Sequence, residues 1–279
     1  KLTVWHNDFV TLGTNSIEKT GNGGDVNGDE FPSRFIPNFR LKRSIIESNL
    51  PTGYWRAPGS CGYGWAFQSF IDELAHAGGR DPVEFRLEIL GADREVPVTG
   101  GGRGRPYSAT RMKNVLRLAA EKAGWGKTQR PRGQGQGVAF HYSHAGYVAV
   151  VADVTVAQDG TLKVDKLTAA VDVGPIVNLS GAENQVQGSL IDGLGAAWFL
   201  EITVENGRVQ QTNYADYALI RMPDSPKIET HFIESANPPT GLGEPALPPV
   251  APAVCNAIFA ATGKRIRTLP IQNTDLSWS

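Results

Sequence analysis

The first residue in this sequence whose setting suggests chemistry is Glu244, in the stretch TGLGEPALPPV at 240–250. It is the only charged side chain of that stretch, and it stands directly ahead of an apolar segment. Gly241 and Gly243 allow another group to approach the backbone closely, while the prolines that follow restrict the chain. A carboxylate held rigidly among apolar residues suits a general base. The alternative is a capping acid for the helix expected after Pro249, although Glu244 lies early for that role.

Two further stretches carry polar groups that need partners. GYWRAPGS places Trp55 and Arg56 in a Gly- and Pro-rich turn ahead of a predicted helix, which suggests a contact between the guanidinium and an anion. Gln185 and Gln187 fall in an otherwise apolar predicted helix, so we expect both amides to be buried and to bond to backbone groups or to a polar ligand. Ordinary hydrogen bonding within the core is the alternative for both sets.

A thiol nucleophile is a third candidate, at Cys61 in GSCGYGW, with His141 and His144 as candidate bases. The stretch differs from thiol-protease signatures, because Pro58 stands where the first cysteine of such a signature falls. A small buried thiol is therefore the favoured interpretation. Placed at i and i+3 of one alternating strand, the two histidines are expected on opposite faces, where they cannot share a metal ion.

Residues 13–31 are rich in Gly, Asn and Asp and are predicted to form a surface loop. Asp25, Asn27 and Asp29 alternate there as the first ligands of a calcium loop do. Glu30, however, occupies the position at which that motif requires glycine, so we expect an ordinary solvated loop and no metal site.

Composition excludes several classes of protein. The 279 residues carry a formal net charge of −1, which gives no field to attract nucleic acid or an anionic membrane. No apolar run reaches the ~18 residues of a membrane span. The two cysteines, Cys61 and Cys255, are too few for an iron–sulfur cluster and are too far apart for a Cys-x-x-Cys pair. Because the chain begins KLTVWHNDFV, without an initiator Met, we expect a processed chain or a fragment; no compartment is indicated.

Hydrophobic periodicity predicts an α+β fold, with mixed sheets and packed helices. We expect an N-terminal segment over 1–130, with a long loop and helices, and a hairpin-rich segment over 131–279 that carries Glu244, the two co-folded as one unit. A long hairpin is expected over 137–174 with its turn at Asp159-Gly160, and a second one turning at Asn206-Gly207. Helices are expected at 65–77, 83–90, 108–123, 182–200 and 253–262.

Several long stretches, taken in order, resemble one family. They are TGYWRAPGS, SFIDELAHAGGRDPVEFRLEIL, VDVGPIVNLSGAENQVQGSLIDGLG and TGLGEPALPPVAPAVCNAIFAATGKRIRTLPI. Together they look like the C-terminal half of the molybdopterin-binding large subunit of the xanthine dehydrogenase and aldehyde oxidase family, in particular its isoquinoline oxidoreductase beta-subunit type. The resemblance covers roughly residues 35–275.

The resemblance implies a role for each matching residue. Glu244 matches the glutamate of the family's G-x-G-E motif, which acts as the catalytic base, and Gly243 is the adjacent glycine that lets the metal centre come close. Gln185 matches the glutamine of a Q-V-E-G motif that contacts the pterin, although Gln187 stands where many members have Glu. Trp55, Arg56 and Ala57 match a loop that passes beneath the metal centre, in a form that departs from the Gly- and Phe-rich version of several members.

Two family motifs, a G-G-G-F-G run and a G-Q-G cofactor loop, are not matched; the repeated Gly-Gln-Gly at 133–137 falls in a segment that aligns elsewhere. A complete site is therefore expected to need the N-terminal half of the subunit, on this chain or on a separate one. The implied cofactor is molybdenum–molybdopterin, plain or as the cytosine dinucleotide, with iron–sulfur clusters in a small partner subunit.

The leading hypothesis is a molybdenum hydroxylase subunit that oxidises an aldehyde or N-heteroaromatic carbon with water as the oxygen source. The alternatives are a non-catalytic scaffold or assembly module of the same fold and a thiol hydrolase that acts through Cys61.

Overall fold

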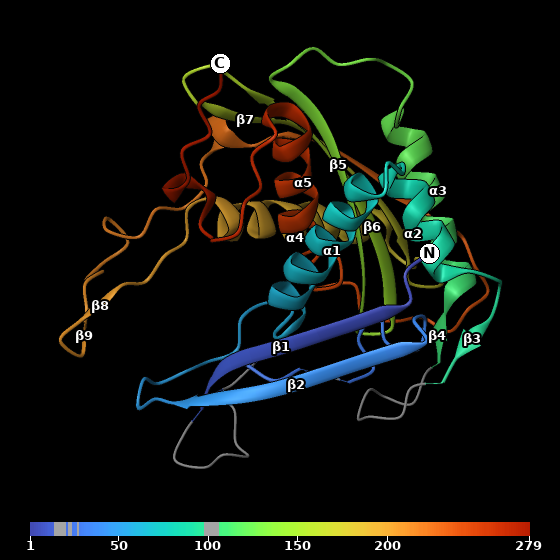
Figure 1. The fold of residues 1–279 in the computed structure, drawn as a ribbon, viewed down its shortest axis with the longest axis horizontal. Helices are drawn as coiled ribbons and strands as arrows, with labels where there is room; N and C mark the ends of the chain where they lie inside the picture. The colour runs from blue at the N-terminus through green and yellow to red at the C-terminus, as the bar shows by residue number, and fades with distance from the viewer. Residues whose placement is uncertain (14–20, 22–23, 27, 98–105) are drawn as a thin grey trace.

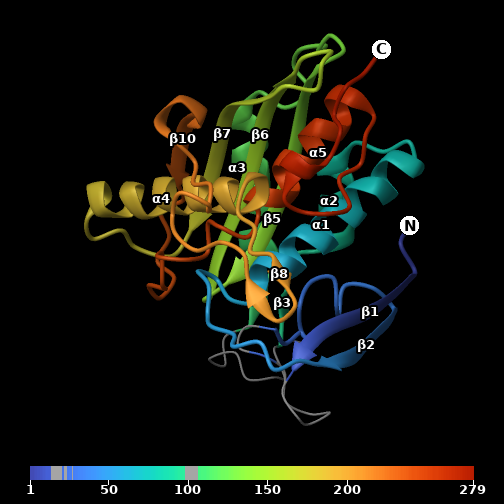
Figure 2. The ribbon, with the colours of Figure 1, turned by 90° about the vertical axis from the view of Figure 1, so that its left-hand side faces the viewer.

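A four-stranded sheet organises the chain, which the computed structural model describes over residues 1–13, 21, 24–26, 28–97 and 106–279. Strands β5 (Gln134–Ser143), β6 (Gly146–Val156) and β7 (Leu162–Asp172) form an antiparallel meander. β10 (Lys227–Phe232) pairs parallel to β7, so the strand order is β10-β7-β6-β5; Figure 1 labels β5, β6 and β7, and Figure 2 also labels β10. The sheet is therefore mixed, with β6 and β7 in its interior.

Helices cover both faces of this sheet. α1 (Ser60–Ala77), α2 (Pro82–Leu90) and α3 (Ala109–Ala123) supply one core. α4 (Leu179–Trp198) and α5 (Val250–Thr262) supply the other, and α1 also contacts α5 beside β5. Figure 2 shows α4 and α5 on one side of the strands and α3 on the opposite side.

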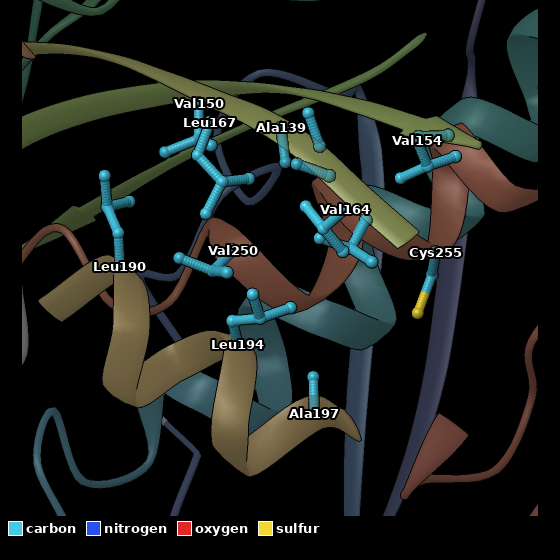
Figure 3. Packing of buried hydrophobic residues seen from close by; sticks show 14 of the residues in the cluster. Ala139, Val150, Val154, Val164, Leu167, Leu190, Leu194, Ala197, Val250 and Cys255 are labelled. Atoms are coloured by element: carbon cyan, nitrogen blue, oxygen red, sulfur yellow. The ribbon is translucent and has the colours of Figure 1, made fainter. Parts of the chain in front are cut away.

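Alternating residues of the strands separate the two cores. Val138 and Phe140 of β5 pack with the α1–α3 cluster, whereas Ala139 between them packs with α4 and α5. This period of two is the geometry of a strand that is covered on both faces. Figure 3 shows the second core, where Leu190 and Leu194 of α4 lie close to Val250 of α5. Each such fully buried side chain contributes about 1.5–3 kcal/mol relative to exposure.

Smaller elements surround this centre. β1 (Val4–Gly13) and β2 (Asn38–Glu47) form a two-stranded parallel sheet next to α1 (Figure 1). Trp5 of β1 packs edge-on against Phe67 and Phe70 of α1. Two short hairpins and two 3₁₀ turns complete the description: β3 (Glu95–Val96) with β4 (Tyr107–Ser108), β8 (Val204–Glu205) with β9 (Arg208–Val209), η1 (Met222–Asp224) and η2 (Ile271–Asn273).

The predicted fold class, α+β with mixed sheets and packed helices, is confirmed. Helix ends also follow the expected signals: Asp81 accepts the backbone N–H groups of Val83 and Glu84 at 2.8 and 3.0 Å, and Ser108 caps α3. Gly124 and Gly263 end their helices in the left-handed conformation, with φ of 65° and 79°. Local side-chain chemistry was therefore sufficient to place these boundaries.

Three details differ from expectation. The segment 137–174 holds an additional turn at His144 and Ala145, with φ of 53° and 62°, so it forms a three-stranded meander instead of one hairpin. β2 was not predicted, because its exposed, charge-rich residues show no clean alternation. Phe70, whose spacing from Phe67, Ile71 and Leu74 predicts that it shares their inward helical face, is 44% exposed.

Glycines in β5 allow α5 to lie directly on the sheet. A Cβ atom built on Gly137 would lie 2.2 Å from both the Ala253 carbonyl oxygen and the Ala257 nitrogen, and one on Gly135 would lie 2.2 Å from the Ala257 oxygen. These are backbone atoms, which cannot rotate away. The Gly-Gln-Gly repeat that mimics a cofactor loop is therefore a contact surface between a strand and a helix.

Gly137→Ala is expected to destabilise the protein by about 3 kcal/mol, because the new methyl group must displace the α5 backbone. Gly62→Ala is the matched control, since nothing lies within 4 Å of its Cβ position on α1 and alanine favours a helix. Urea unfolding of both variants checks this. Equal midpoints for the two variants contradict the direct contact between α5 and β5.

Candidate active site

Glu244 lies in the loop between β10 and α5, at the surface end of a segment that is anchored in the core. Residues 245–250 are all buried, whereas 35% of the Glu244 side chain is exposed. The side chain does not cap α5, which begins at Val250 without a side-chain cap. The capping alternative is therefore wrong, and the carboxylate is free to serve another purpose.

Groups from two distant segments contact the Glu244 carboxylate. The backbone nitrogen of Ala57 lies 2.8 Å from Oε1, and Nε2 of His144 lies 2.8 Å from Oε2. Ala57 is fully buried with φ of 54°, a conformation that aims its N–H group at the carboxylate. The two oxygens are thus each bound once, by a loop ahead of α1 and by the β5–β6 turn.

Arg56 joins the Glu244 loop to α4. Its Nε donates to the Gly243 carbonyl at 2.6 Å, and Nη2 contacts the backbone oxygen and Oε1 of Gln185 at 3.2 and 3.3 Å. Nη1 lies 3.5 Å from the Asp192 carboxylate. Ser189 of α4 adds a contact from Oγ to the Gly243 carbonyl at 3.4 Å. The anion partner expected for Arg56 is thus in part the chain's own Asp192.

The structure brings together most of the candidate residues. Arg56, Ala57, Gln185, Gly243 and Glu244 form one connected hydrogen-bonded cluster. The side chain of Trp55 is 45% exposed, and the network runs through its two neighbours in the chain rather than through it.

The two glutamines of α4 correct one expectation. Gln185 and Gln187 both lie on the exposed side of α4, so they are not buried amides. The helix has an apolar composition, but its buried residues occupy one face only, as Val186 and Leu190 illustrate. The Gln185 amide is therefore accessible from outside the chain while its oxygen bonds to Arg56.

The Cys61 thiol contacts the backbone of the cluster and is a poor nucleophile. Its Sγ donates to the carbonyl oxygens of Arg56 and Ala57 at 3.2 and 3.1 Å. Burial, with the charges of Asp192 and Glu244 adding to it, raises the pKa of this thiol to about 12. The reactive thiolate is therefore scarce at neutral pH.

The sequence did not indicate Ser189 or Asp192, and it suggested His144 only as a base for Cys61 and not as a partner of Glu244. Asp192 stands seven residues after Gln185 in a helix, a spacing that returns to the same face. The sequence pattern could therefore have predicted that the two side chains lie together. The placement of His144 was not predictable, because the turn His144-Ala145 lacks the Gly or Asn that usually marks such a turn. The two candidate histidines accordingly lie in a strand and in a turn, and not on opposite faces of one strand.

The calcium-like alternation has a different explanation. Asp25 pairs with Arg43 at 2.5 Å and Asp29 pairs with Arg34 at 2.6 Å, while Asn27 lies outside the described residues. Across the described ranges of the chain, no group of three or more His, Cys, Asp or Glu side chains is arranged to hold a metal ion.

The chain is similar in sequence to proteins of a molybdopterin-binding family. Residues 88–226 match the family model of a molybdopterin cofactor-binding domain. The chain is 33% identical over 247 residues to the membrane-bound aldehyde dehydrogenase [pyrroloquinoline-quinone] of Gluconacetobacter polyoxogenes, a match that covers 85% of this chain and 31% of that protein. It is 28% identical over 262 residues to the isoquinoline 1-oxidoreductase subunit beta of Brevundimonas diminuta, covering 92% and 31%. The chain therefore spans less than a third of the length of either relative.

The same fold occurs in a solved structure. Quinoline 2-oxidoreductase from Pseudomonas putida 86 superimposes with a TM-score of 0.78 at 14% identity, over 96% of this chain and 59% of that one. The fold and the sequence matches agree on one class, the cofactor-binding part of a molybdenum hydroxylase large subunit. The chain belongs to the molybdopterin-binding subunits of the xanthine dehydrogenase and aldehyde oxidase family. Within the part of the chain that is described, every helix is too short or too polar to cross a membrane.

A partly buried acid, Glu30, lies close to a buried histidine, His141. Nε2 of His141 in β5 is 4.0 Å from Oε2 of Glu30, and the Nδ1 side of the ring faces Gly64 of α1. Burial lowers the pKa of His141 to about 4. Burial, with the charge of Asp29 adding to it, raises the pKa of Glu30 to about 7. Both side chains are therefore held mainly in their neutral forms near pH 6.

Glu30→Gln is expected to remove one pH dependence of stability. The folded-state pKa of about 7 lies above the ordinary value of 4.5, so the folded chain keeps a proton that the unfolded chain releases. The free energy of unfolding must therefore fall as the pH rises from about 4.5 to about 7. His141 works in the opposite direction, between its ordinary 6.5 and about 4, but it is common to both proteins.

The difference in unfolding free energy between wild type and E30Q isolates the Glu30 contribution. E30Q should gain relative stability across that window and stay level above it. Glu205→Gln, in the exposed strand β8, is the control. A difference that does not vary with pH contradicts the partly buried, protonated state of Glu30.

Proposed function

We propose that this chain is the part of a molybdenum hydroxylase that carries the catalytic base, and that the enzyme oxidises an aldehyde or an N-heteroaromatic carbon with water as the oxygen source. The observation that carries the proposal is the Glu244 carboxylate, fixed through both oxygens at the end of a buried segment. Membership of the molybdopterin-binding family supports it. So do the names of two relatives, an aldehyde dehydrogenase and an isoquinoline oxidoreductase.

The donors around Glu244 suit a polar, anionic organic cofactor. The Arg56 side chain is 23% exposed, and Gln185 beside it lies on the exposed side of α4. Gly188 and Gly243 add no side chain to this surface, and the Cβ positions of both have no atom nearer than 3.7 Å, so a flat group can approach the backbone there. Molybdenum–molybdopterin, plain or as the cytosine dinucleotide, would be held by Arg56, Gln185 and Gly243, with Trp55 and Ala57 alongside. When bound, it supplies the two-electron redox chemistry of the reaction.

Glu244 would act as the base of this reaction. An ionised carboxylate has about four acceptor positions, two on each oxygen. Each oxygen of Glu244 uses one of them, for Ala57 or for His144. At 35% exposure, the remaining positions are open to a water-derived hydroxyl whose proton must be removed as its oxygen is transferred to the substrate carbon. The proton is then passed to solvent.

Completion of the site would come from further polypeptide. The chain spans 31% of the isoquinoline oxidoreductase subunit that it resembles, so the remaining glycine-rich cofactor loops are assigned to the N-terminal half of the subunit, on this chain or on another. Electrons would leave through a small iron–sulfur subunit. A non-catalytic scaffold of the same fold is the competing proposal, and it predicts no bound cofactor.

Glu244→Gln is expected to lower kcat by roughly 100- to 10,000-fold, because it removes a general base while keeping the size and one acceptor oxygen of the side chain. The measurement is dye-linked oxidation of aldehydes and N-heterocycles by protein isolated with any chain that accompanies it. Glu234→Gln, an exposed residue ahead of the same loop, is the matched control and should keep full activity. Full activity of E244Q would contradict the proposed role of Glu244 as the base.

Arg56→Met is expected to reduce the molybdenum and pterin content of the isolated protein by roughly tenfold or more, because charge-assisted bonds across the cofactor surface are lost. Arg267→Met, which breaks a surface pair with Glu73, is the control. Metal analysis and pterin fluorescence after denaturation give the result. Since one relative is named for pyrroloquinoline quinone, quinone absorbance is measured on the same samples. A quinone in place of molybdenum, or neither in the wild type, overturns the cofactor assignment.

A further inference from the structure

His144 sits in a turn that is pressed against the Glu244 loop. Both His144 and Ala145 adopt the left-handed conformation, with φ of 53° and 62°. This conformation costs roughly 1 kcal/mol or more of conformational free energy per residue. The flanking pair Ser143 and Gly146 closes the hairpin between β5 and β6. Such a turn persists only where its surroundings fix it.

Contacts on both sides of Glu244 fix this turn. A Cβ atom on Gly146 would lie 3.2 Å from the Pro245 ring, so the strand after the turn packs against the residue that follows Glu244. A Cβ atom on Gly241 would lie 3.8 Å from Cβ of His144, so the residues before Glu244 also touch the turn. The imidazole is therefore placed opposite the carboxylate by backbone contacts, and not by chance rotation of a surface side chain.

His144 and Glu244 form a close pair. Nε2 of His144 lies 2.8 Å from Oε2 of Glu244, and because an ionised carboxylate only accepts, any hydrogen bond between them is donated by the imidazole. With 32% and 35% of the two side chains exposed, such a pair adds little to overall stability. Its consequence is geometric: without it the carboxylate keeps one partner, the Ala57 N–H on Oε1, and can turn about that bond.

We infer that His144 is a positioning residue that holds the Glu244 carboxylate in the orientation needed for proton removal. The inference rests on the proposed role of Glu244 as the base. Arg56 and Asp192, the neighbouring charges, face each other at 3.5 Å and bind the Gly243 side of the loop, so they do not replace the imidazole. Cys61, the other ionisable group nearby, donates to the Arg56 and Ala57 carbonyls.

Three variants separate the hydrogen bond from the shape of the turn. His144→Gln keeps an N–H donor, His144→Leu removes it at similar size, and His144→Asn keeps the left-handed turn while its amide is too short to reach Oε2. We expect H144L and H144N to lower kcat by roughly 10- to 100-fold with little change in KM, and H144Q to restore most of the rate. His6→Leu, at an exposed site in β1, is the control.

Crystal structures of the same variants give a readout that does not depend on activity. In H144L and H144N the Glu244 carboxylate should leave its place or occupy several positions, and in H144Q it should stay. An unmoved carboxylate in H144L and H144N, equal kcat in all variants, or a loss of rate that H144Q fails to restore overturns the inference.

The E244Q variant distinguishes the proposed role of Glu244 as the base from the positioning role of His144. If E244Q is inactive and H144L is fully active, only the proposed role of His144 is contradicted. An active E244Q removes the base, and with it both proposals. If H144L fails to fold, H144N and H144Q carry the comparison, because asparagine tolerates the left-handed conformation of this turn.

Discussion

Direct packing of α5 on β5 is the constraint from which the rest of the site follows. Side chains normally separate a helix from the sheet that it covers, but Gly135 and Gly137 have none where the α5 backbone crosses. The helix therefore lies directly on the strand, and Pro245 of the buried segment ahead of it packs against Gly146 of β6. This packing holds the residue next to Glu244 in place.

The candidate site is assembled from four segments that meet at this point. The loop ahead of α1 contributes Arg56 and the Ala57 N–H group, the β5–β6 turn contributes His144, and α4 contributes Gln185. The segment ahead of α5 contributes Glu244. None of these segments forms the site alone, and each is anchored in a different part of the two cores. The polar network is small, but its members are held by well-packed elements, which is the condition for a carboxylate with a defined orientation.

The sequence predicted those features that depend on local chemistry. Capping at Asp81 and Ser108 and the turn at Asn206-Gly207 were all predictable, because each is set by a few adjacent residues. Glu244 could be singled out because a lone charge among glycines and prolines is rare. Arg56 and Gln185 were candidates from their local setting, and the resemblance to a known family added Ala57 and linked all three to Glu244.

What could not be predicted depends on tertiary context. The outward orientation of Gln185 depends on which face of α4 meets the sheet, and the apolar composition of that helix suggested burial on all sides. The turn at His144 has no sequence signal, since it is stabilised by the packing of Gly146 against Pro245 instead of by its own residues. The parallel pairing of β1 with β2 joins segments without regular alternation.

The wide separation of the site residues along the chain has a consequence for biosynthesis. The bonds from Arg56 and Ala57 to the Glu244 loop link residues 187 positions apart, and α5, which anchors that loop, follows it in the chain. Contacts of such long range form late in folding, because the entropy of closing the intervening chain must be overcome first. On a ribosome, the donors at Arg56 and Ala57 are made long before their acceptors. The cluster of Arg56, Ala57, Gln185 and Glu244 therefore forms only after the segment around Glu244 has been synthesised.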